Sequence, residues 1–157
     1  MAASNDTAEV REVIDAQAAA LSAKKAQEVI GHGTRNTVVF SLAPPLVAPA
    51  GGGTAGLEAW FATWKGPIGY DRSRLAITAE ADLAIAYGLA RMTGEKIDGA
   101  RVDLWFRETL ALRKVAGAWK IFHQHSSVPF YMDGSFRAAV DLGPPANADF
   151  EDSSRRA

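Results

Sequence analysis

Hydrophobic and polar positions alternate most regularly in the second half of the chain. The clearest case is a pair of runs that flank the short turn sequence Val115-Ala116-Gly117. A period of two is typical of a strand with one buried face, and glycine suits a tight hairpin turn. We predict four consecutive antiparallel strands, at residues 75–80, 83–94, 102–114 and 118–128.

The N-terminal region instead repeats its hydrophobic positions at helical spacing, at Val10, Val13, Ile14, Ala18 and Leu21. We predict a first helix that Asp6 caps while Glu9 reaches back to it, and a second helix from the cap Ser22 to Ile30. A β-branched and aromatic segment then predicts a strand at residues 36–42.

A third helix is predicted from the cap Thr54 to Gly66-Pro67, because Leu57, Trp60, Phe61 and Trp64 share one face. The order of helix, helix, strand, helix and four strands indicates an α+β fold. We expect one domain at residues 1–142 and a polar C-terminal tail at residues 143–157. Residues 136–142 are expected to form a helical turn or a lid.

Composition narrows the classes of function. The chain has 157 residues, 48% of them hydrophobic and 22% charged, which suits a single domain with one core. A net charge of −1 gives no basic surface for nucleic acid, so no nucleic-acid partner is expected. With no cysteine, no basic start and no apolar run long enough to cross a bilayer, we expect a cytoplasmic protein without a membrane partner.

Three parts of the chain together resemble the SnoaL-like branch of the nuclear transport factor 2-like superfamily. They are VVFSLAPPL at residues 38–46, the strand meander, and Trp-x-Ile-x-His-x-His-x-Ser-Val-Pro-Phe at residues 119–130. The resemblance implies a cone-shaped, cystatin-like fold, in which a curved antiparallel sheet and N-terminal helices enclose a pocket. The superfamily includes ketosteroid isomerases, polyketide cyclases, scytalone dehydratase and a non-enzymatic kinase association domain, so the fold does not name the reaction.

The resemblance places Ser41 where ketosteroid isomerases carry the aspartate that acts as general base. A serine hydroxyl is too weak a base at neutral pH unless another base activates it. The second acid of those isomerases corresponds to Thr109, which is not an acid either. Ketosteroid isomerase chemistry is therefore not expected, and Ser41 is expected to line the pocket beside Trp60 or Trp64.

The last hairpin determines which side chains share a face. A three-residue turn at 115–117 would pair Lys114 with Ala118 and set Glu108 opposite Gln124. The face toward the helices would then hold Leu104, Phe106, Glu108, Leu110, Leu112, Phe122, Gln124 and Ser126. The opposite face would hold Trp105, Arg107, Thr109, Trp119, Ile121, His123 and His125.

Glu108 is the candidate catalytic residue, because a carboxyl among apolar neighbours is a typical general acid or base. The alternative is a structural role, with Gln124, and Arg91 as a possible further partner, satisfying the carboxylate. Phe106, Gln124 and Ser126 would line the substrate site beside it.

Tyr87 and Arg91 share a face of the preceding strand. The resemblance to the kinase association domain implies that they bind an anionic or carbonyl-bearing ligand. Otherwise Tyr87 is a core ring and Arg91 an exposed strand end. Trp60 and Trp64 lie four residues apart, so at least one belongs to the core and the other is expected to form a wall of the pocket.

His123 and His125 point to the same side of one strand, as two metal ligands could. No third ligand is specified by spacing, so we expect a polar ladder covered by a second subunit, and no metal. No cofactor is expected either, because Gly51-Gly52-Gly53 lacks the lysine of a phosphate-binding loop. Two functions stay open: an isomerase, cyclase or dehydratase acting on a small, partly hydrophobic molecule, and a non-enzymatic ligand-binding or assembly module.

Overall fold

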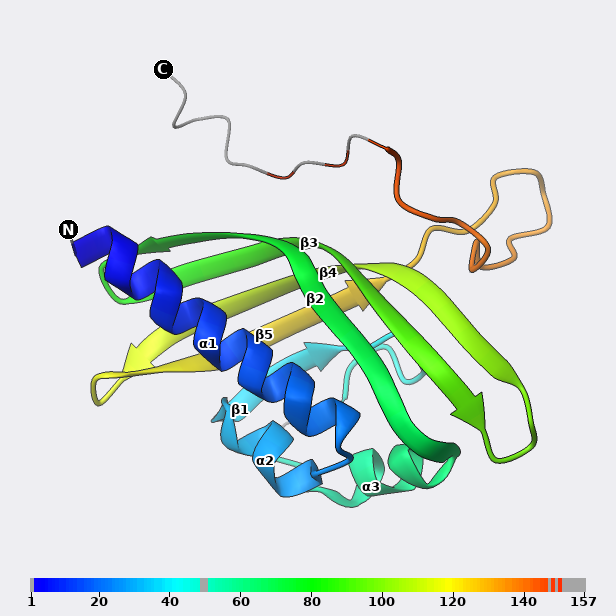
Figure 1. The fold of residues 1–157 in the computed structure, drawn as a ribbon, viewed down its shortest axis with the longest axis horizontal. Helices are drawn as coiled ribbons and strands as arrows, with labels where there is room; N and C mark the ends of the chain where they lie inside the picture. The colour runs from blue at the N-terminus through cyan, green and yellow to red at the C-terminus, as the bar shows by residue number, and fades with distance from the viewer. Residues whose placement is uncertain (1, 49–50, 147, 149, 151–157) are drawn as a thin grey trace.

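The computed structural model describes residues 2–48, 51–146, 148 and 150. Three helices and a five-stranded sheet form the fold in the order α1 (Ala2–Ser22), α2 (Ala26–Gly31), β1 (Gly33–Phe40), α3 (Ala55–Ala62), β2 (Trp64–Glu80), β3 (Leu83–Lys96), β4 (Arg101–Val115) and β5 (Ala118–Ser127) (Figure 1). The strands lie in the order β1-β5-β4-β3-β2. β1 runs parallel to β5, and the other pairs are antiparallel. The predicted α+β fold with a curved sheet and N-terminal helices is confirmed.

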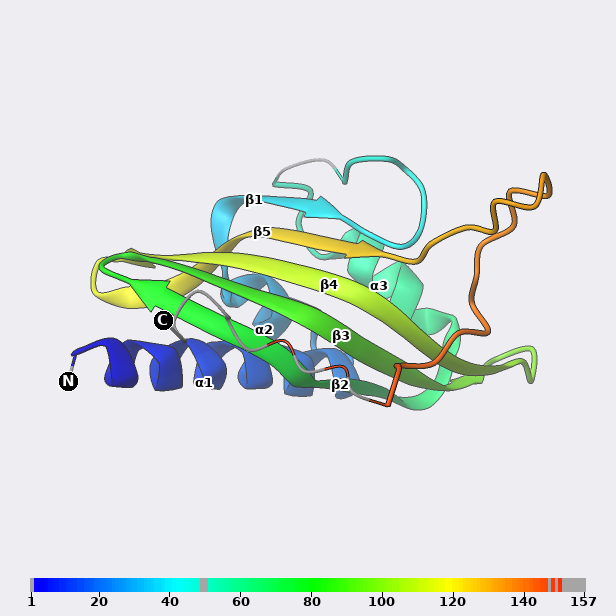
Figure 2. The ribbon, with the colours of Figure 1, turned by 90° about the horizontal axis from the view of Figure 1, so that it is seen from above.

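The three helices lie on one side of the curved sheet (Figures 1 and 2). We call the sheet face toward them the inner face and the opposite face the outer face. Two clusters of buried side chains fill the space beneath the inner face. One joins Val10 and Ile14 of α1 to Leu110 and Ile121 of the sheet. The other surrounds Phe61, Trp64, Ile68 and Phe106 near α3.

β2 is longer than predicted, because it begins at Trp64 rather than at Leu75. Its first half contains glycine, proline and several charged residues, which hide the alternation of Ile68, Tyr70 and Arg72 toward the inner face. The register shifts between Asp71 and Arg74, as at a β-bulge. The extra residue allows both Arg72 and Leu75 to point inward, and both are buried.

The predicted register of the last hairpin is wrong. The turn has two residues, Ala116 and Gly117, both with positive φ, and Val115 pairs with Ala118. A second shift follows at Phe122, which lies unpaired between Ile121 and His123. These two shifts change the partner of Glu108 from Gln124 to Ser126.

The two-residue turn changes the predicted faces of β5 between the turn and the bulge at Phe122. Trp119 and Ile121 are buried in the core rather than on the outer face. Phe122 turns outward, where Arg113 lies over its ring. Beyond the bulge, Gln124 and Ser126 face inward, as predicted.

The ends of the chain differ from the predictions as well. α1 begins at Ala2, so Asp6 does not cap it but accepts a hydrogen bond from Lys114 Nζ. Residues 136–142 form no helix. Ala138, within this segment, instead forms an isolated bridge with Phe130. Part of the predicted tail, residues 147, 149 and 151–157, lies outside the described residues. In the described part of the chain, no helix is long and apolar enough to cross a membrane.

Candidate functional site

Glu108 lies at the centre of a hydrogen-bonded network on the inner face. It sits midway along β4, and only 1% of its surface is exposed. Its carboxylate accepts hydrogen bonds from Tyr70 Oη at 2.8 Å, Gln124 Nε2 at 3.0 Å and Ser126 Oγ at 3.1 Å. The guanidinium of Arg72 donates to both carboxylate oxygens, through Nε and Nη2. We call Tyr70, Arg72, Glu108, Gln124 and Ser126 the Glu108 network.

Arg72 connects this network to α1. It is 2% exposed, and its Nη1 donates to Gln17 Oε1 at 2.8 Å and to the Ile14 carbonyl at 3.4 Å. Burial opposes the charge of Arg72, but the negative charge and hydrogen bonds of Glu108 outweigh burial and raise its pKa. Arg72 therefore pairs with Glu108 and at the same time binds α1 to the sheet.

Tyr70 supplies the half-buried side of the network. Its ring packs edge-on against Phe106, with the ring centres 5.7 Å apart, and the Arg72 guanidinium lies 4.9 Å from the Tyr70 ring centre. Burial, followed by the neighbouring charge of Glu108, raises the pKa of Tyr70 far above its usual value. The hydroxyl therefore stays protonated and donates a hydrogen bond to the carboxylate.

This geometry limits the chemistry open to Glu108. Four side chains donate to the carboxylate, Tyr70 and Arg72 from β2 and Gln124 and Ser126 from β5. Oε2 accepts from all four of them, whereas among the described residues Oε1 accepts from Arg72 Nε alone. A general base needs a free lone pair within reach of the substrate proton. Because Glu108 is 1% exposed, it can act on a bound molecule only if the side chains around it move to admit that molecule.

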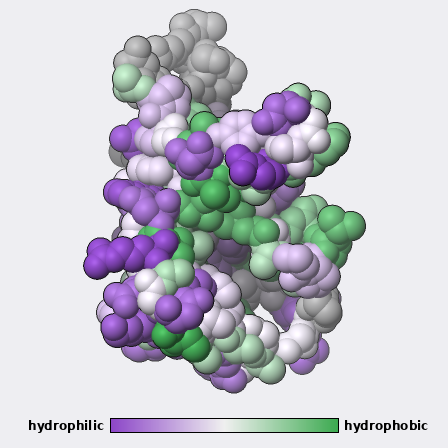
Figure 3. Space-filling model, turned by 90° about the vertical axis from the view of Figure 1, so that its right-hand side faces the viewer, coloured by the Kyte–Doolittle hydropathy of each residue, from purple (hydrophilic) through white to green (hydrophobic). Residues whose placement is uncertain are grey.

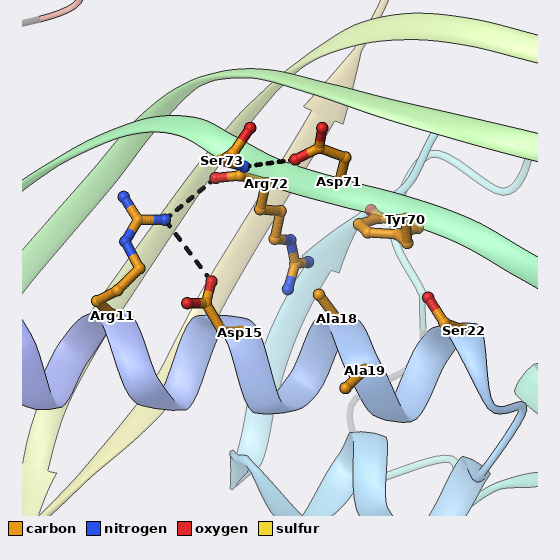
Figure 4. A pocket seen from close by; sticks show the side chains of 9 residues that line it. All are labelled: Arg11, Asp15, Ala18, Ala19, Ser22, Tyr70, Asp71, Arg72 and Ser73. Carbon is orange, nitrogen blue, oxygen red and sulfur yellow. Dashed lines mark hydrogen bonds and ion pairs between the residues drawn. The ribbon is translucent and has the colours of Figure 1, made fainter.

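A groove between α1 and β2 gives access to the network (Figure 4). Its volume is about 540 Å³, and it is lined by Arg11, Asp15, Ala18, Ala19, Ser22, Tyr70, Asp71, Arg72 and Ser73. Tyr70 and Arg72 point from β2 toward α1, so two members of the network form part of the wall. Arg11 bridges the two elements by donating to the carbonyls of Arg72 and Leu75.

Tyr87 and Arg91 do not lie with the network. On β3 the inward positions are Ala86 and Ala90, both buried, so Tyr87 and Arg91 face the outer side. Arg91 forms two hydrogen bonds with Asp103, at 2.8 and 2.7 Å. The prediction that Arg91 satisfies Glu108 is therefore wrong, and Arg72 takes that position.

Ser41 lies outside the groove as well. Its side chain is exposed just after β1, and its hydroxyl donates to the Ala43 carbonyl at 2.8 Å. The expected position of Ser41 beside Trp60 or Trp64 stays a prediction. Trp64 is buried in the core, whereas Trp60 is half-buried and meets Trp64 edge-on at 5.7 Å.

The two histidines lie on the outer face, as predicted. Phe40 contacts both rings edge-on, at 4.9 Å from His123 and 5.3 Å from His125. His123 Nδ1 forms a hydrogen bond with the Val38 carbonyl. Within the described ranges, no three His, Cys, Asp or Glu side chains gather as a metal site would require.

Sequence reasoning missed Tyr70, Arg72 and Gln17. All three belong to the site only through long-range contacts, because Arg72 lies 36 residues from Glu108 and 55 from Gln17 in the sequence. The available signal was the inward alternation of Ile68, Tyr70 and Arg72, which would have extended β2 toward Trp64.

The sequence profile of the SnoaL-like domain family matches residues 10–131. The chain therefore belongs to the SnoaL-like family of the nuclear transport factor 2-like superfamily. No curated protein matches the chain.

Solved structures share the fold. A nuclear transport factor 2-like protein of unknown function from Pseudomonas putida KT2440 is 26% identical, with 90% of this chain and 98% of that chain covered and a TM-score of 0.79. A ketosteroid isomerase-like protein from Erwinia carotovora atroseptica is 19% identical, with 78% and 95% covered and a TM-score of 0.61. A protein with a cystatin-like fold from Nostoc punctiforme is 16% identical, with 83% and 93% covered and a TM-score of 0.62.

Proposed function

We propose that the protein binds a small, partly hydrophobic molecule in the groove between α1 and β2, against the Tyr70 and Arg72 end of the Glu108 network. The observation that carries this proposal is the contact between that groove and a buried, hydrogen-bonded ion pair. Ligand sites commonly combine a concave surface of this size with a few fixed polar groups.

The chemistry of the groove favours a molecule with both polar and apolar parts. Ala18 and Ala19 are small and leave space on α1, while the Tyr70 ring offers an apolar surface. Asp15 and Ser22 add hydrogen-bonding groups at the rim. Arg72 is already neutralised by Glu108, so the network presents polar atoms without a net charge.

Two variants that replace an alanine of α1 by leucine test this binding site. Ala19→Leu fills the groove, whereas Ala16→Leu places the same side chain on an exposed position of α1 outside it. A screen of small aromatic and alicyclic fragments by saturation-transfer NMR should find binders of the wild type and of Ala16→Leu that Ala19→Leu no longer binds. Equal binding to both variants would contradict the proposed site.

A second candidate is acid–base catalysis of isomerisation, cyclisation or dehydration at the same place. The fold shared with a ketosteroid isomerase-like protein supports it. Catalysis by Glu108 would require the substrate to reach its buried carboxylate, where Oε1 accepts a hydrogen bond from Arg72 alone among the described residues. A substrate that the Arg72→Met/Glu108→Gln double variant converts at the wild-type rate would remove this role, because a positioned proton-transfer group contributes roughly a hundredfold or more.

We also propose that a second copy of the chain covers the outer face. Trp105, Tyr87 and Phe122 are only partly buried there, and Trp105 lies between Arg74 and Arg91. Partly exposed rings gathered on one sheet face are typical of a subunit interface. Light scattering should give twice the chain mass. The cytoplasmic location expected from the sequence stays a prediction that cell fractionation would check.

A further inference from the structure

The segment after β5 forms a hairpin of its own. Tyr131 N donates to the Arg137 carbonyl at 2.9 Å, and Ala139 N donates to the Pro129 carbonyl at 2.8 Å. The Tyr131 hydroxyl also donates to Asp141, at 2.6 Å from its nearer carboxylate oxygen. We call residues 129–141 the C-terminal hairpin. Its hydrogen bonds close within the segment, so its shape does not depend on a binding partner.

The C-terminal hairpin carries large apolar side chains that its own chain leaves in water. Phe130 is 51% exposed, Phe136 70% and Met132 83%. Within the described part of the chain, the ring contact of Phe130 and Phe136 is with each other, at 5.8 Å. Figure 3 shows that hydrophobic residues gather across this end of the molecule. Exposed apolar groups that cluster in this way usually mark an interaction surface.

The backbone at Phe136 strengthens this reading. Its φ of +53° lies in the left-handed region, which costs free energy for a residue with a bulky side chain. Conformations of this kind persist where the surrounding structure holds them, and they concentrate at functional positions. Here the hydrogen bonds of the hairpin hold this backbone, and the aromatic ring at its tip stays 70% exposed, as it would at an interaction surface.

The position of the hairpin identifies the partner. It lies beyond the strand ends, on the side of the sheet away from the helices (Figures 1 and 2). A two-fold axis that brings two outer faces together would place each hairpin alongside the other copy. A single symmetric arrangement then buries both hairpins and both outer faces at once.

We propose that the C-terminal hairpin is an arm that packs on the outer face of a second copy of this chain. This proposal rests on the dimer proposed above. Charge is consistent with it: the hairpin carries Asp133, Arg137 and Asp141, whereas Arg107 on the outer face has a hydroxyl partner, Ser127, but no acidic partner among the described residues. The arm adds Phe136 and Met132 to the apolar surface that the two sheet faces would bury by themselves.

Sedimentation equilibrium of a hairpin variant tests the arm. Met132→Ser combined with Phe136→Gly removes the apolar tip and relieves the strained backbone. The dimer dissociation constant should rise about tenfold or more, as on removal of a central aromatic contact. The control Ile97→Ser removes an exposed residue from the β3–β4 turn and should leave the constant unchanged.

The possible results separate the two proposals. An unchanged dissociation constant in a protein that dimerises overturns the arm and leaves the dimer standing. A wild-type monomer at micromolar concentration overturns both. Phe136→Gly should not lower the melting temperature of the dilute monomer, because glycine accepts this φ without strain. A clear loss of monomer stability would assign the tip a structural role and overturn the arm.

The absence of cysteine allows a direct test of contact. Met132→Cys labelled with a benzophenone maleimide carries the only thiol-linked photoprobe in the chain. Irradiation should cross-link it to outer-face peptides of β3, β4 or β5 in a second copy, which mixing of isotopically labelled and unlabelled protein distinguishes from the same copy. Cross-links confined to the same copy, or to α1–α3 of the other, would overturn the proposal.

Discussion

The Arg72–Glu108 pair makes a sharp energetic prediction. Glu108→Gln removes the negative charge but retains the shape of the side chain, so the Arg72 cation remains buried with neutral acceptors alone: the new amide oxygen, Gln17 and the Ile14 carbonyl. Removing one partner of a buried ion pair leaves an uncompensated charge. We expect Glu108→Gln to lower the free energy of unfolding by about 3–5 kcal/mol.

The reverse substitution should cost less. Arg72→Met leaves the Glu108 carboxylate with the neutral donors of Tyr70, Gln124 and Ser126, which continue to solvate its charge. The network is therefore asymmetric, because the anion has alternative donors and the cation has few alternative acceptors. The double variant Arg72→Met/Glu108→Gln buries no charge and should lie within about 2 kcal/mol of the wild type. The remaining cost arises from Gln17 Oε1, which loses the Arg72 donor.

Urea unfolding followed by tryptophan fluorescence measures all four proteins, provided that the protein concentration is equal throughout. The double-mutant cycle should show a coupling of several kcal/mol. A cost below about 1 kcal/mol for Glu108→Gln, or single-variant costs that simply add in the double variant, would refute the view that this pair is buried and mutually dependent.

Two further predictions concern individual positions. A Cβ at Gly88 would lie 2.3 Å from the Arg74 carbonyl oxygen, so Gly88→Ala should lower the melting temperature. A Cβ at Gly56 would have no atom within 4 Å, so Gly56→Ala should raise the free energy of unfolding by about 0.5–1 kcal/mol. Equal effects of the two variants in calorimetry would contradict the close approach of β3 to the β2 bulge. Burial, and then the charge of Lys120, lowers the pKa of His32 below its usual 6.5, so the unfolded chain binds the proton more readily. The stability that depends on neutral His32 is present above pH 6.5 and is lost as the pH falls through the folded-state pKa. The melting temperature of His32→Asn should therefore change less between pH 7 and 5 than that of the wild type.

Local pattern was sufficient for the elements whose neighbours are close in sequence. The helical repeat of Val10, Ile14 and Leu21 predicted α1 and its buried face, and all three are in the core. The alternation of Phe106, Glu108 and Leu110 predicted the inner face of β4, because side chains of one strand must alternate whatever its partner is. These features follow from the period of the backbone alone.

Pairing between strands could not be predicted in the same way. The bulge at Phe122 shifts the register of β5 against β4, yet Ile121 and Phe122 are consecutive hydrophobic residues, and the local pattern does not say which of them faces inward. A turn of two residues instead of three has the same effect on register, and Ala116-Gly117 is compatible with either. Because one residue of shift moves a whole set of side chains to the opposite face, Trp119 and Ile121 were assigned to the wrong side.

The candidate site shows the same difference between local pattern and strand pairing. The sequence by itself determined that the chain is a SnoaL-like α+β protein and that Glu108 faces inward beside Gln124 and Ser126. Only the tertiary structure decided that Arg72 and Tyr70 donate to the carboxylate, because the charge of Arg72 suggests the surface and the bulge that follows it breaks the alternation between Arg72 and Leu75. A buried charge is tolerated only when its partner is in place, and that partner comes from a strand that is not adjacent to β4 in the sheet.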